Sequence, residues 1–402
     1  MTGKRKRKLA MPDTLIIVAS VVLLVAILSW IIPSGTYDYQ EMNINGRIRN
    51  VAIDGTYHTI DKSEVTTTGF LGFFSVLYRG CVEAADVIFM ILCCCGTFGV
   101  VVKTGAFHAG IGTILKKLKG KEILLVPIIM MIFGLGGSVF GMASEFYGFY
   151  PLIVGLGVAL GYDAMFGFAI IAVGEFVGFM GATLNPYSVG IAQTISGVEL
   201  YSGTGYRAIC FVIFMAISII YVMVYGRKIK KNPGASVVFG EKNIHAFDRD
   251  ELNEYSFTLK DGLVLLDVLV VLVVLMLGLI KWGWDFPQLC GLFLLMSMIA
   301  AAICKWSPNK WCSEFIDSAK TAMWGCILTG IAKAITVVMQ DAQIMDTVIY
   351  GLSNVLKNAP HAVSAQVMLV VQTLINFFIP SATGQASATM PIMAQLADII
   401  GV

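Results

Sequence analysis

Long stretches of the chain carry little or no charge, and they limit its fold more than any other feature. Thr14–Ile32 is nineteen residues without a charged side chain, and Pro287–Ile303 is seventeen. Ala164–Ala182, Tyr206–Tyr225 and Gly262–Ile280 contain one charged residue each. About twenty apolar helical residues cross the ~30 Å hydrocarbon core of a bilayer. Because lipid cannot satisfy backbone polar groups, these stretches predict transmembrane helices.

The composition excludes an ordinary soluble domain. Charged residues make up 13% of the chain and apolar residues 57%, whereas a soluble domain carries about 25% charged residues. The nine cysteines lie mostly within apolar stretches and lack the spacing of zinc ligands, so we interpret them as small packing residues. The sequence also lacks the H-E-x-x-H and G-x-S-x-G motifs of common hydrolases. We therefore expect a polytopic membrane protein that has no cofactor or metal and is not an enzyme.

The N-terminus predicts the orientation. A basic cluster at Lys4–Lys8 precedes the first apolar stretch, which is longer than the ~7–15 residue core of a signal peptide and ends without a small-x-small cleavage site. Beside a spanning helix, such a cluster is typical of a cytoplasmic anchor rather than of a nucleic-acid site. We expect a cytoplasmic segment at residues 1–13 and a location in the bacterial inner membrane.

Basic loops divide the rest of the chain into two halves. Residues 14–225 form the predicted first transmembrane repeat, and its polar stretch Pro33–Gly69 is expected as an outer loop. Residues 226–260 form a cytoplasmic linker that begins with several basic residues. Residues 261–402 form the predicted second repeat, in which Ser313–Met339 is expected as one span.

Each half contains a long apolar stretch that is broken in its middle. Residues 123–162 carry one charge, Glu145, and several central glycines, so each leg is about fifteen residues, roughly 22 Å long. Such legs favour a re-entrant hairpin over two full spans joined by a tight turn. Residues 362–400 predict a second hairpin around a polar stretch at 380–389. In addition, Gly181–Pro186 interrupts the helix expected over residues 164–196.

The two halves share an order of elements. Glu145 and Gln385 are 240 residues apart, and so are Pro151 and Pro391. Counting crossings gives the two hairpins opposite orientations. Inverted repeats with broken helices near the middle of the membrane are typical of alternating-access carriers. We therefore expect an all-α inverted-repeat transporter fold with two re-entrant hairpins and broken helices.

The broken segments supply the candidate site. A helix break leaves backbone N–H and C=O groups that can hold a solute or an ion, and carboxylates at membrane depth usually serve a function. Structural alternatives are a proline kink at the first-half break and pairing of the carboxylates with Lys320 or Lys333. The candidate binding residues are Ser144, Glu145, Glu175, Thr183, Asn185, Ser381, Thr383, Gly384, Gln385 and Ser387. Among them, Thr183, Asn185 and Thr383 are candidates for binding a coupling Na+; a coupling proton is the alternative.

Three motifs resemble a known family. Ser381–Asp398, SATGQASATMPIMAQLAD, is similar to the signature of the YfcC-type membrane proteins, which are relatives of the DcuC-type C4-dicarboxylate carriers in the larger ion-transporter superfamily. Gly181–Gly197, GATLNPYSVGIAQTISG, and Ser144–Pro151, SEFYGFYP, resemble the first-half motifs of the same family. The resemblance implies an elevator-like fold, a homodimer, and a site enclosed by hairpin tips and broken helices. It also implies further spans after the second hairpin, so we expect the second repeat to be incomplete in this sequence.

The expected function is secondary active transport of small carboxylates or amino acids across the inner membrane, driven by an ion gradient or by exchange. Some family members are labelled as antiporters of basic amino acids, and the sequence leaves this alternative open. Glu145 and Glu175 would suit a cationic substrate, whereas hairpin N-termini would suit a carboxylate. A channel or a non-transporting membrane scaffold is the alternative from another class. The expected partners are the bilayer and a small-molecule substrate.

Overall fold

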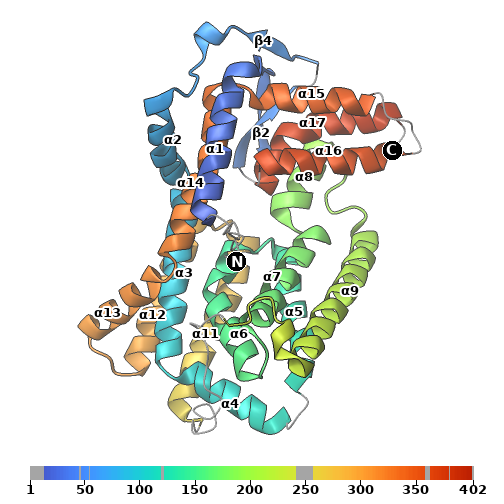
Figure 1. Ribbon diagram of the computed structural model, residues 1–402. Helices are drawn as coiled ribbons and strands as arrows, with labels where there is room; N and C mark the ends of the chain where they lie inside the picture. The colour runs from blue at the N-terminus through green and yellow to red at the C-terminus, as the bar shows by residue number, and fades with distance from the viewer. Residues whose placement is uncertain are drawn as a thin grey trace, which may run out of the picture.

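The computed structural model describes residues 13–44, 47–53, 55–118, 122–240, 257–357, 363–379 and 381–400, and it is nearly all helical (Figure 1). Six helices in this part of the chain are long and apolar enough to cross a membrane. They are α1 (Thr14–Ile31), α3 (Ala85–Lys103), α9 (Thr204–Lys231), α11 (Leu259–Lys281), α12 (Phe286–Ile303) and α14 (Met323–Asp341).

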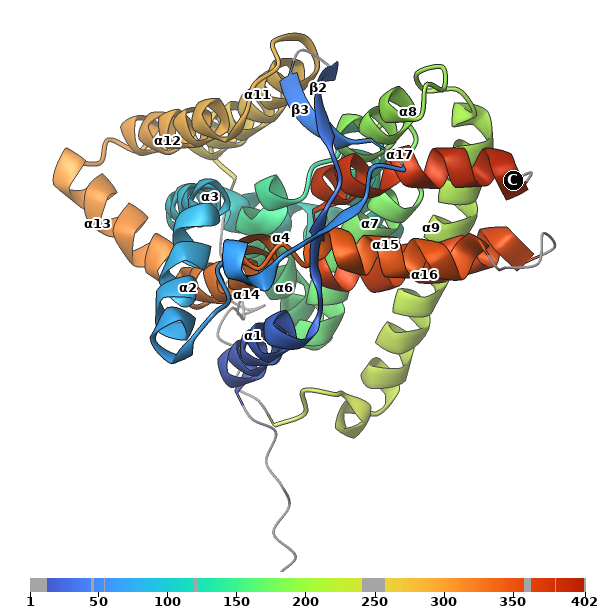
Figure 2. The same cartoon turned by 90° about the horizontal axis from the view of Figure 1, so that it is seen from above.

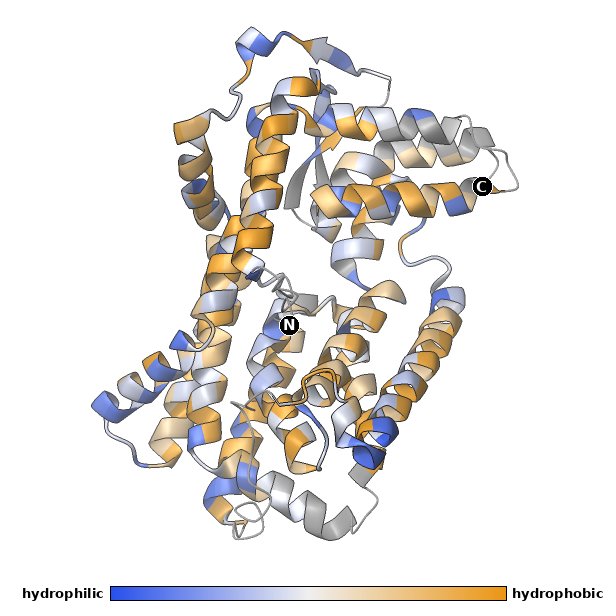
Figure 3. Cartoon of the chain, in the orientation of Figure 1, coloured by the Kyte–Doolittle hydropathy of each residue, from blue (hydrophilic) through white to orange (hydrophobic). Residues whose placement is uncertain are grey.

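The outward faces of several helices are apolar. Figure 3 shows this for α1 and α9, and on α9 the side chains of Ile213, Ile217 and Ile220 are at least half exposed. A continuous apolar surface of this kind is unstable in water but suits lipid. By contrast, α13 (Pro308–Lys320) is polar and projects from one side of the molecule (Figure 1 and Figure 3).

The largest core lies around α5 (Leu125–Leu135), α6 (Tyr150–Ala159) and α7 (Ala164–Met180). Helix α7 packs against α5, α6 and α9, and residues of α3 and α12 belong to the same buried cluster. Glycines bring α5 and α7 into backbone contact, because a Cβ atom at Gly178 would overlap the carbonyl oxygen of Gly134. Small residues of this kind are common where membrane helices approach closely.

A second core joins α14 to α1 and to α2 (Phe70–Glu83), a helix that the sequence patterns did not predict. The span predicted over Ser313–Met339 is present, but its bounds are corrected to Met323–Asp341. Here α13 ends at Lys320 and α14 begins at Met323. The backbone N–H groups of Thr321 and Ala322 bond to carbonyls three residues back, so the last turn of α13 tightens and the helix ends.

The expectation of an all-α chain is corrected by four short strands within the stretch predicted as a loop. Strand β1 (Ser34–Thr36) pairs antiparallel with β4 (His58–Ile60), and β2 (Tyr39–Ile44) pairs antiparallel with β3 (Arg47–Ala52). These segments contain aromatic and β-branched residues, which favour strands. Their polar residues do not prevent pairing, because strand positions can face away from the core.

The strands are anchored to α15 (Met345–Lys357) through one carboxylate. Asp346 accepts hydrogen bonds from the Thr36 hydroxyl and the Tyr37 N–H, both at 3.1 Å, and from the Tyr39 hydroxyl at 2.8 Å. Although Tyr39 is 44% exposed, partial burial of its hydroxyl end raises the pKa of that hydroxyl, and the charge of Asp346 raises it further. Nearby, the hydroxyl of Ser34 donates to the carbonyl of Ala342 at 2.6 Å. Hydrogen bonds between residues about 310 positions apart therefore hold the strands against α15 and the end of α14.

The C-terminal helices complete the structure. Both views place α15 beside α16 (Ser364–Phe378) and α17 (Ala382–Ile400) (Figure 1 and Figure 2). Helix α17 packs against α8 (Ile191–Ile195) and β3, where Val51, Ile191 and Ala386 form a small buried cluster. At the other end of the molecule, α4 (Ala106–Leu118) packs against α11.

Candidate functional site

The first predicted hairpin segment reverses through irregular turns. Helix α5 leads into a π-helical turn, η3 (Gly136–Phe140), and a 3-10 helix, η4 (Ser144–Phe149), leads into α6. Between them, Gly141 has φ +68°, and a Cβ atom there would lie 2.5 Å from Oδ1 of Asn185. Glycine tolerates both the positive φ and the close approach of Asn185, because it has no Cβ atom. We call residues 141–145 the first tip.

The next helix is interrupted as well. Helix α7 ends at Met180, and helical structure resumes as η5 (Pro186–Gly190), which continues into α8. The buried side chain of Asn185 caps this second start, because its Oδ1 accepts from the N–H groups of Tyr187 (2.9 Å) and Ser188 (3.2 Å). Its Nδ2 donates to the carbonyl of Gly137 at 3.1 Å. Asn185 therefore connects the two helix interruptions through hydrogen bonds.

Ser138 and Thr183 make further hydrogen bonds between these breaks. The Thr183 N–H donates to the Ser138 carbonyl at 2.9 Å, and the Ser138 hydroxyl donates to the Gly181 carbonyl at 2.9 Å. The hydroxyls of Ser138 and Thr183 are 3.1 Å apart. Thr183 and Asn185 thus lie together at one break, where their side chains make structural hydrogen bonds.

The second tip, residues 381–384 at the start of α17, lies against the same region. The hydroxyl of Thr383 donates to the carbonyl of Tyr187 in η5 at 3.1 Å. Both tips line one cavity of about 450 Å³, which we call the acidic cavity. Five of the predicted residues line it: Ser144, Glu145, Ser381, Thr383 and Gly384.

The acidic cavity is lined by three carboxylates and, in the described part of the chain, by no lysine, arginine or histidine. Glu145 is 8% exposed, and its Oε2 accepts from the Ala143 N–H at 2.9 Å. Asp285 lies at the N-terminus of α12, and Asp86 lies in the first turn of α3. The two aspartates were missed as site residues because acidic residues at helix N-termini are ordinary capping features.

Glu175 does not line the acidic cavity. It is 1% exposed within α7, where the Tyr150 hydroxyl donates to its Oε2 at 3.0 Å. Lys320, a candidate partner for such carboxylates, pairs instead with Asp317 at 2.7 Å. The structure therefore places Glu145 and Glu175, which the sequence had grouped together, in different surroundings.

Gln385 lines another cavity, of about 340 Å³, which we call the Arg207 cavity. Its Nε2 donates to the carbonyl of Gln372 in α16 at 2.8 Å. Ser387 lies farther along α17, and its side chain is outside the described part of the structure. The predicted polar stretch of the second hairpin is thus divided between two cavities.

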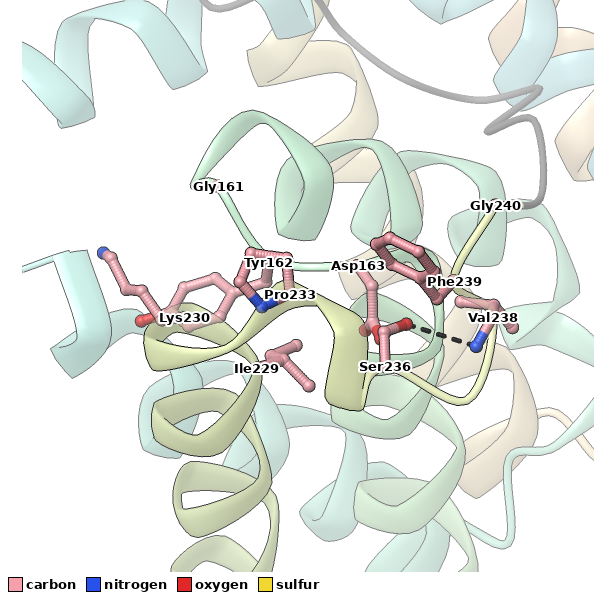
Figure 4. A pocket seen from close by; sticks show the side chains of 10 residues that line it. All are labelled: Gly161, Tyr162, Asp163, Ile229, Lys230, Pro233, Ser236, Val238, Phe239 and Gly240. Carbon is pink, nitrogen blue, oxygen red and sulfur yellow. Dashed lines mark hydrogen bonds between the residues drawn. The ribbon is translucent and has the colours of Figure 1, made fainter.

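A third cavity, of about 200 Å³, lies between the α6–α7 turn and residues 233–240 (Figure 4). Asp163 caps α7 by accepting from the Phe166 N–H at 2.7 Å, and it also accepts from the hydroxyls of Tyr225 (2.6 Å) and Ser236 (2.5 Å). Lys230 lies 5.0 Å from the centre of the Tyr162 ring. These contacts attach the loop after α9 to the core, so we interpret this cavity as structural.

Residues 11–402 match the family of the C4-dicarboxylate anaerobic carrier, DcuC. The chain belongs to the DcuC family. It is 31% identical over 435 residues to the Escherichia coli (strain K12) protein named "Putative basic amino acid antiporter YfcC", covering 100% of this chain and 85% of that protein. It is 28% identical over 442 residues to an uncharacterized protein of Haemophilus influenzae (strain ATCC 51907 / DSM 11121 / KW20 / Rd), covering 100% and 86%.

Among solved structures, this DcuC-family chain is similar to the Alcanivorax borkumensis YdaH transporter, with 13% identity, a TM-score of 0.44, and coverage of 97% of this chain and 84% of that chain. The resemblance to YfcC-type and DcuC-type proteins is confirmed by the family match and by the relatives. The chain is therefore a multi-pass membrane protein of a transporter family, and not an enzyme.

Proposed function

We propose that this DcuC-family protein is a secondary active transporter of basic amino acids, which it moves by alternating access. One observation carries the proposal: Asp86, Glu145 and Asp285 line a cavity that both tips share. Its size, about 450 Å³, lies within the ~300–1,000 Å³ of small-molecule sites. The name of the E. coli relative, an antiporter of basic amino acids, supports the same substrate class.

The charge of the acidic cavity favours a cation. Two unit charges 4 Å apart interact by about 4 kcal/mol at an effective dielectric constant near 20. A lysine-like or arginine-like side chain gains such attraction from the carboxylates, whereas a dianion is repelled. The described lining offers a dianion no basic side chain in compensation.

Transport of C4-dicarboxylates is the second candidate, favoured by the description of the matching family. It would require Glu145 to be protonated when the substrate binds, which would couple transport to a proton. The two candidates therefore differ in the charge that the acidic cavity must carry. The effect of neutralising Glu145 separates them.

The two tips suit an alternating-access mechanism. They come from segments about 240 residues apart in the sequence and line one cavity from different elements. We propose that residues 123–162 and 362–400 are re-entrant hairpins of opposite orientation in the bacterial inner membrane, with a cytoplasmic N-terminus. We also propose a homodimer, and coupling to Na+ near Thr183, Asn185 and Thr383 or to a proton.

The test is exchange in proteoliposomes that contain the purified chain. Vesicles loaded with lysine or, separately, with succinate are supplied outside with labelled lysine, arginine, ornithine, succinate or fumarate, with and without a sodium gradient. We expect saturable counterflow of the basic amino acids alone. Exchange of the dicarboxylates would favour the second candidate, and flux that does not saturate would indicate a channel.

A matched pair of variants tests the acidic cavity. Glu145→Gln removes a carboxylate from the cavity, whereas Glu64→Gln removes one from an exposed position outside it. We expect Glu145→Gln to lower the apparent affinity for lysine at least about tenfold, which corresponds to ~1.4 kcal/mol. Glu64→Gln should leave it unchanged. Equal affinities in the two variants would contradict a role for Glu145 in binding.

A further inference from the structure

The Arg207 cavity adjoins the acidic cavity near the second tip, because Ala382 lines both. It is bounded by α7, the η5–α8 segment, α9, α16 and α17. Most of its lining is apolar. Its polar side chains are Ser188, Arg207, Gln372, Gln385 and Thr389. None of its described lining residues is acidic.

Arg207 lies at the fourth position of α9 and is held by neutral oxygens. Its Nη1 donates to the Ser202 carbonyl at 2.8 Å, and its Nη2 donates to the Thr183 carbonyl at 3.1 Å and to the Thr204 hydroxyl at 3.2 Å. In the described part of the chain, no carboxylate pairs with it. An uncompensated cation in a membrane protein is costly and usually marks a functional site.

Two buried donors at this cavity lack partners among the described residues. They are the Nε–H of Arg207 and the hydroxyl of Ser188. A buried donor left unsatisfied is unfavourable, so such atoms point to a ligand that accepts hydrogen bonds. An anion with two acceptor oxygens, such as a carboxylate, can satisfy both donors and the charge of the guanidinium.

The acidic cavity and the Arg207 cavity share a wall. Phe179 of α7 and Ala382, the first residue of α17, line both of them. A displacement of the second tip relative to α7 would therefore open one cavity into the other. Together they would offer carboxylates at one end and a guanidinium at the other.

We propose that the Arg207 cavity takes the α-carboxylate of the transported amino acid, while the acidic cavity takes its positively charged side chain. Arg207 and Ser188 then determine specificity for solutes that carry a carboxylate. The inference rests on the proposed function and adds to it the orientation of the substrate. It predicts that the protein discriminates a basic amino acid both from a dicarboxylate and from a simple diamine.

The test compares lysine with cadaverine, which differs from lysine only in lacking the α-carboxylate. Each competes for exchange of labelled lysine in proteoliposomes. In the unmodified chain we expect lysine to compete at least about tenfold better than cadaverine. In Arg207→Gln the two should compete equally, because the variant weakens competition by lysine and leaves competition by cadaverine unchanged. Ser188→Ala should also reduce the advantage of lysine over cadaverine, but by a smaller factor.

Arg227→Gln is the matched control, because Arg227 is an exposed arginine near the other end of α9. In this variant the ratio of competition by lysine to competition by cadaverine should equal that of the unmodified chain. Arg207 also donates to the Thr183 carbonyl at the helix break. If its role were purely structural, Arg207→Gln would weaken the competition by lysine and by cadaverine equally. That result, or an unchanged ratio in both Arg207→Gln and Ser188→Ala, would overturn the inference while leaving the proposed function intact. If neither compound competes in the unmodified chain, both fail.

Discussion

At the scale of single residues, Asn185 joins the two breaks of the first half through three hydrogen bonds. We expect Asn185→Ala to lower stability by about 1–3 kcal/mol, because it removes a helix cap and one of the two hydrogen bonds that the Gly137 carbonyl accepts, the other coming from the Gly141 N–H. Asn185→Ser should cost less, since serine can still cap one N–H group. Thermal unfolding in detergent measures both, with exposed Asn232→Ala as a control that should change little.

Gly141 offers a second test at this scale. Alanine there would be strained by φ +68° and would press on the Asn185 amide. We expect Gly141→Ala to lose about 1–3 kcal/mol of stability and most of the exchange activity. Gly291→Ala in α12 is the control, because no atom would lie within 4 Å of its new Cβ atom. Equal unfolding temperatures for the two variants would show that the first tip does not require glycine.

The sequence identified some site residues and missed others for a physical reason. Glu145, Thr183 and Asn185 stand out because they are polar residues inside apolar stretches, where an unsatisfied group is costly. Asp86 and Asp285 lie at helix N-termini, where a carboxylate needs no further explanation. Only the packing of α3 against η4 and of α12 against α3 brings them to the cavity, and no local pattern in the sequence encodes that packing.

At the scale of elements, the attachment of the strands to α15 depends on Asp346. In Asp346→Ala three donors lose their acceptor, so we expect residues 34–44 to exchange amide hydrogens faster than in the unmodified chain. Tyr39→Phe should have a smaller effect, about 0.5–1.5 kcal/mol. Hydrogen exchange measures both. Asp38→Ala, which removes an exposed carboxylate, is the control; equal protection in all three variants would contradict the anchor.

The attachment should also depend on pH in one direction. The pKa of Tyr39 is raised in the folded protein, first by burial and then by Asp346. Above the ordinary tyrosine pKa of about 10, the unfolded chain releases this proton while the folded chain keeps it. The stability that the neutral hydroxyl contributes is therefore present below that pH and lost above it. Hydrogen exchange of residues 34–44 should accelerate more steeply above pH ~10 than in Tyr39→Phe.

The sequence predicted long apolar helices well and short elements poorly. Apolar runs such as Thr14–Ile32 and Pro287–Ile303 correspond closely to α1 and α12, because their length and composition alone define a span. The strands between residues 34 and 60 pair locally but are also held by Asp346 of α15, which is distant in the sequence. Helix α2 includes Arg79, which pairs with Asp341, and this contact likewise is invisible in the sequence.

At the scale of the whole molecule, the hydrogen bond from Thr383 to Tyr187 joins the two halves. If the tips move during transport, a link between these positions should stop it. We expect a short thiol-reactive cross-linker to abolish exchange in the variant Tyr187→Cys/Thr383→Cys, made in a background without the native cysteines, and cleavage of the linker to restore it. Each single-cysteine variant should keep its activity after the same treatment. Full exchange by the cross-linked protein would contradict movement at this contact.

The strands make the first half of the protein depend on the last. Thr36, Tyr37 and Tyr39 donate to Asp346, which a ribosome working at about 5–20 residues per second adds roughly 15–60 s later. During that interval the N-terminal segment cannot reach its final position, whatever its own preferences are. Assembly of this end of the protein therefore occurs late in biosynthesis, and a variant that weakens Asp346 should prolong the period in which proteases can cut residues 34–60.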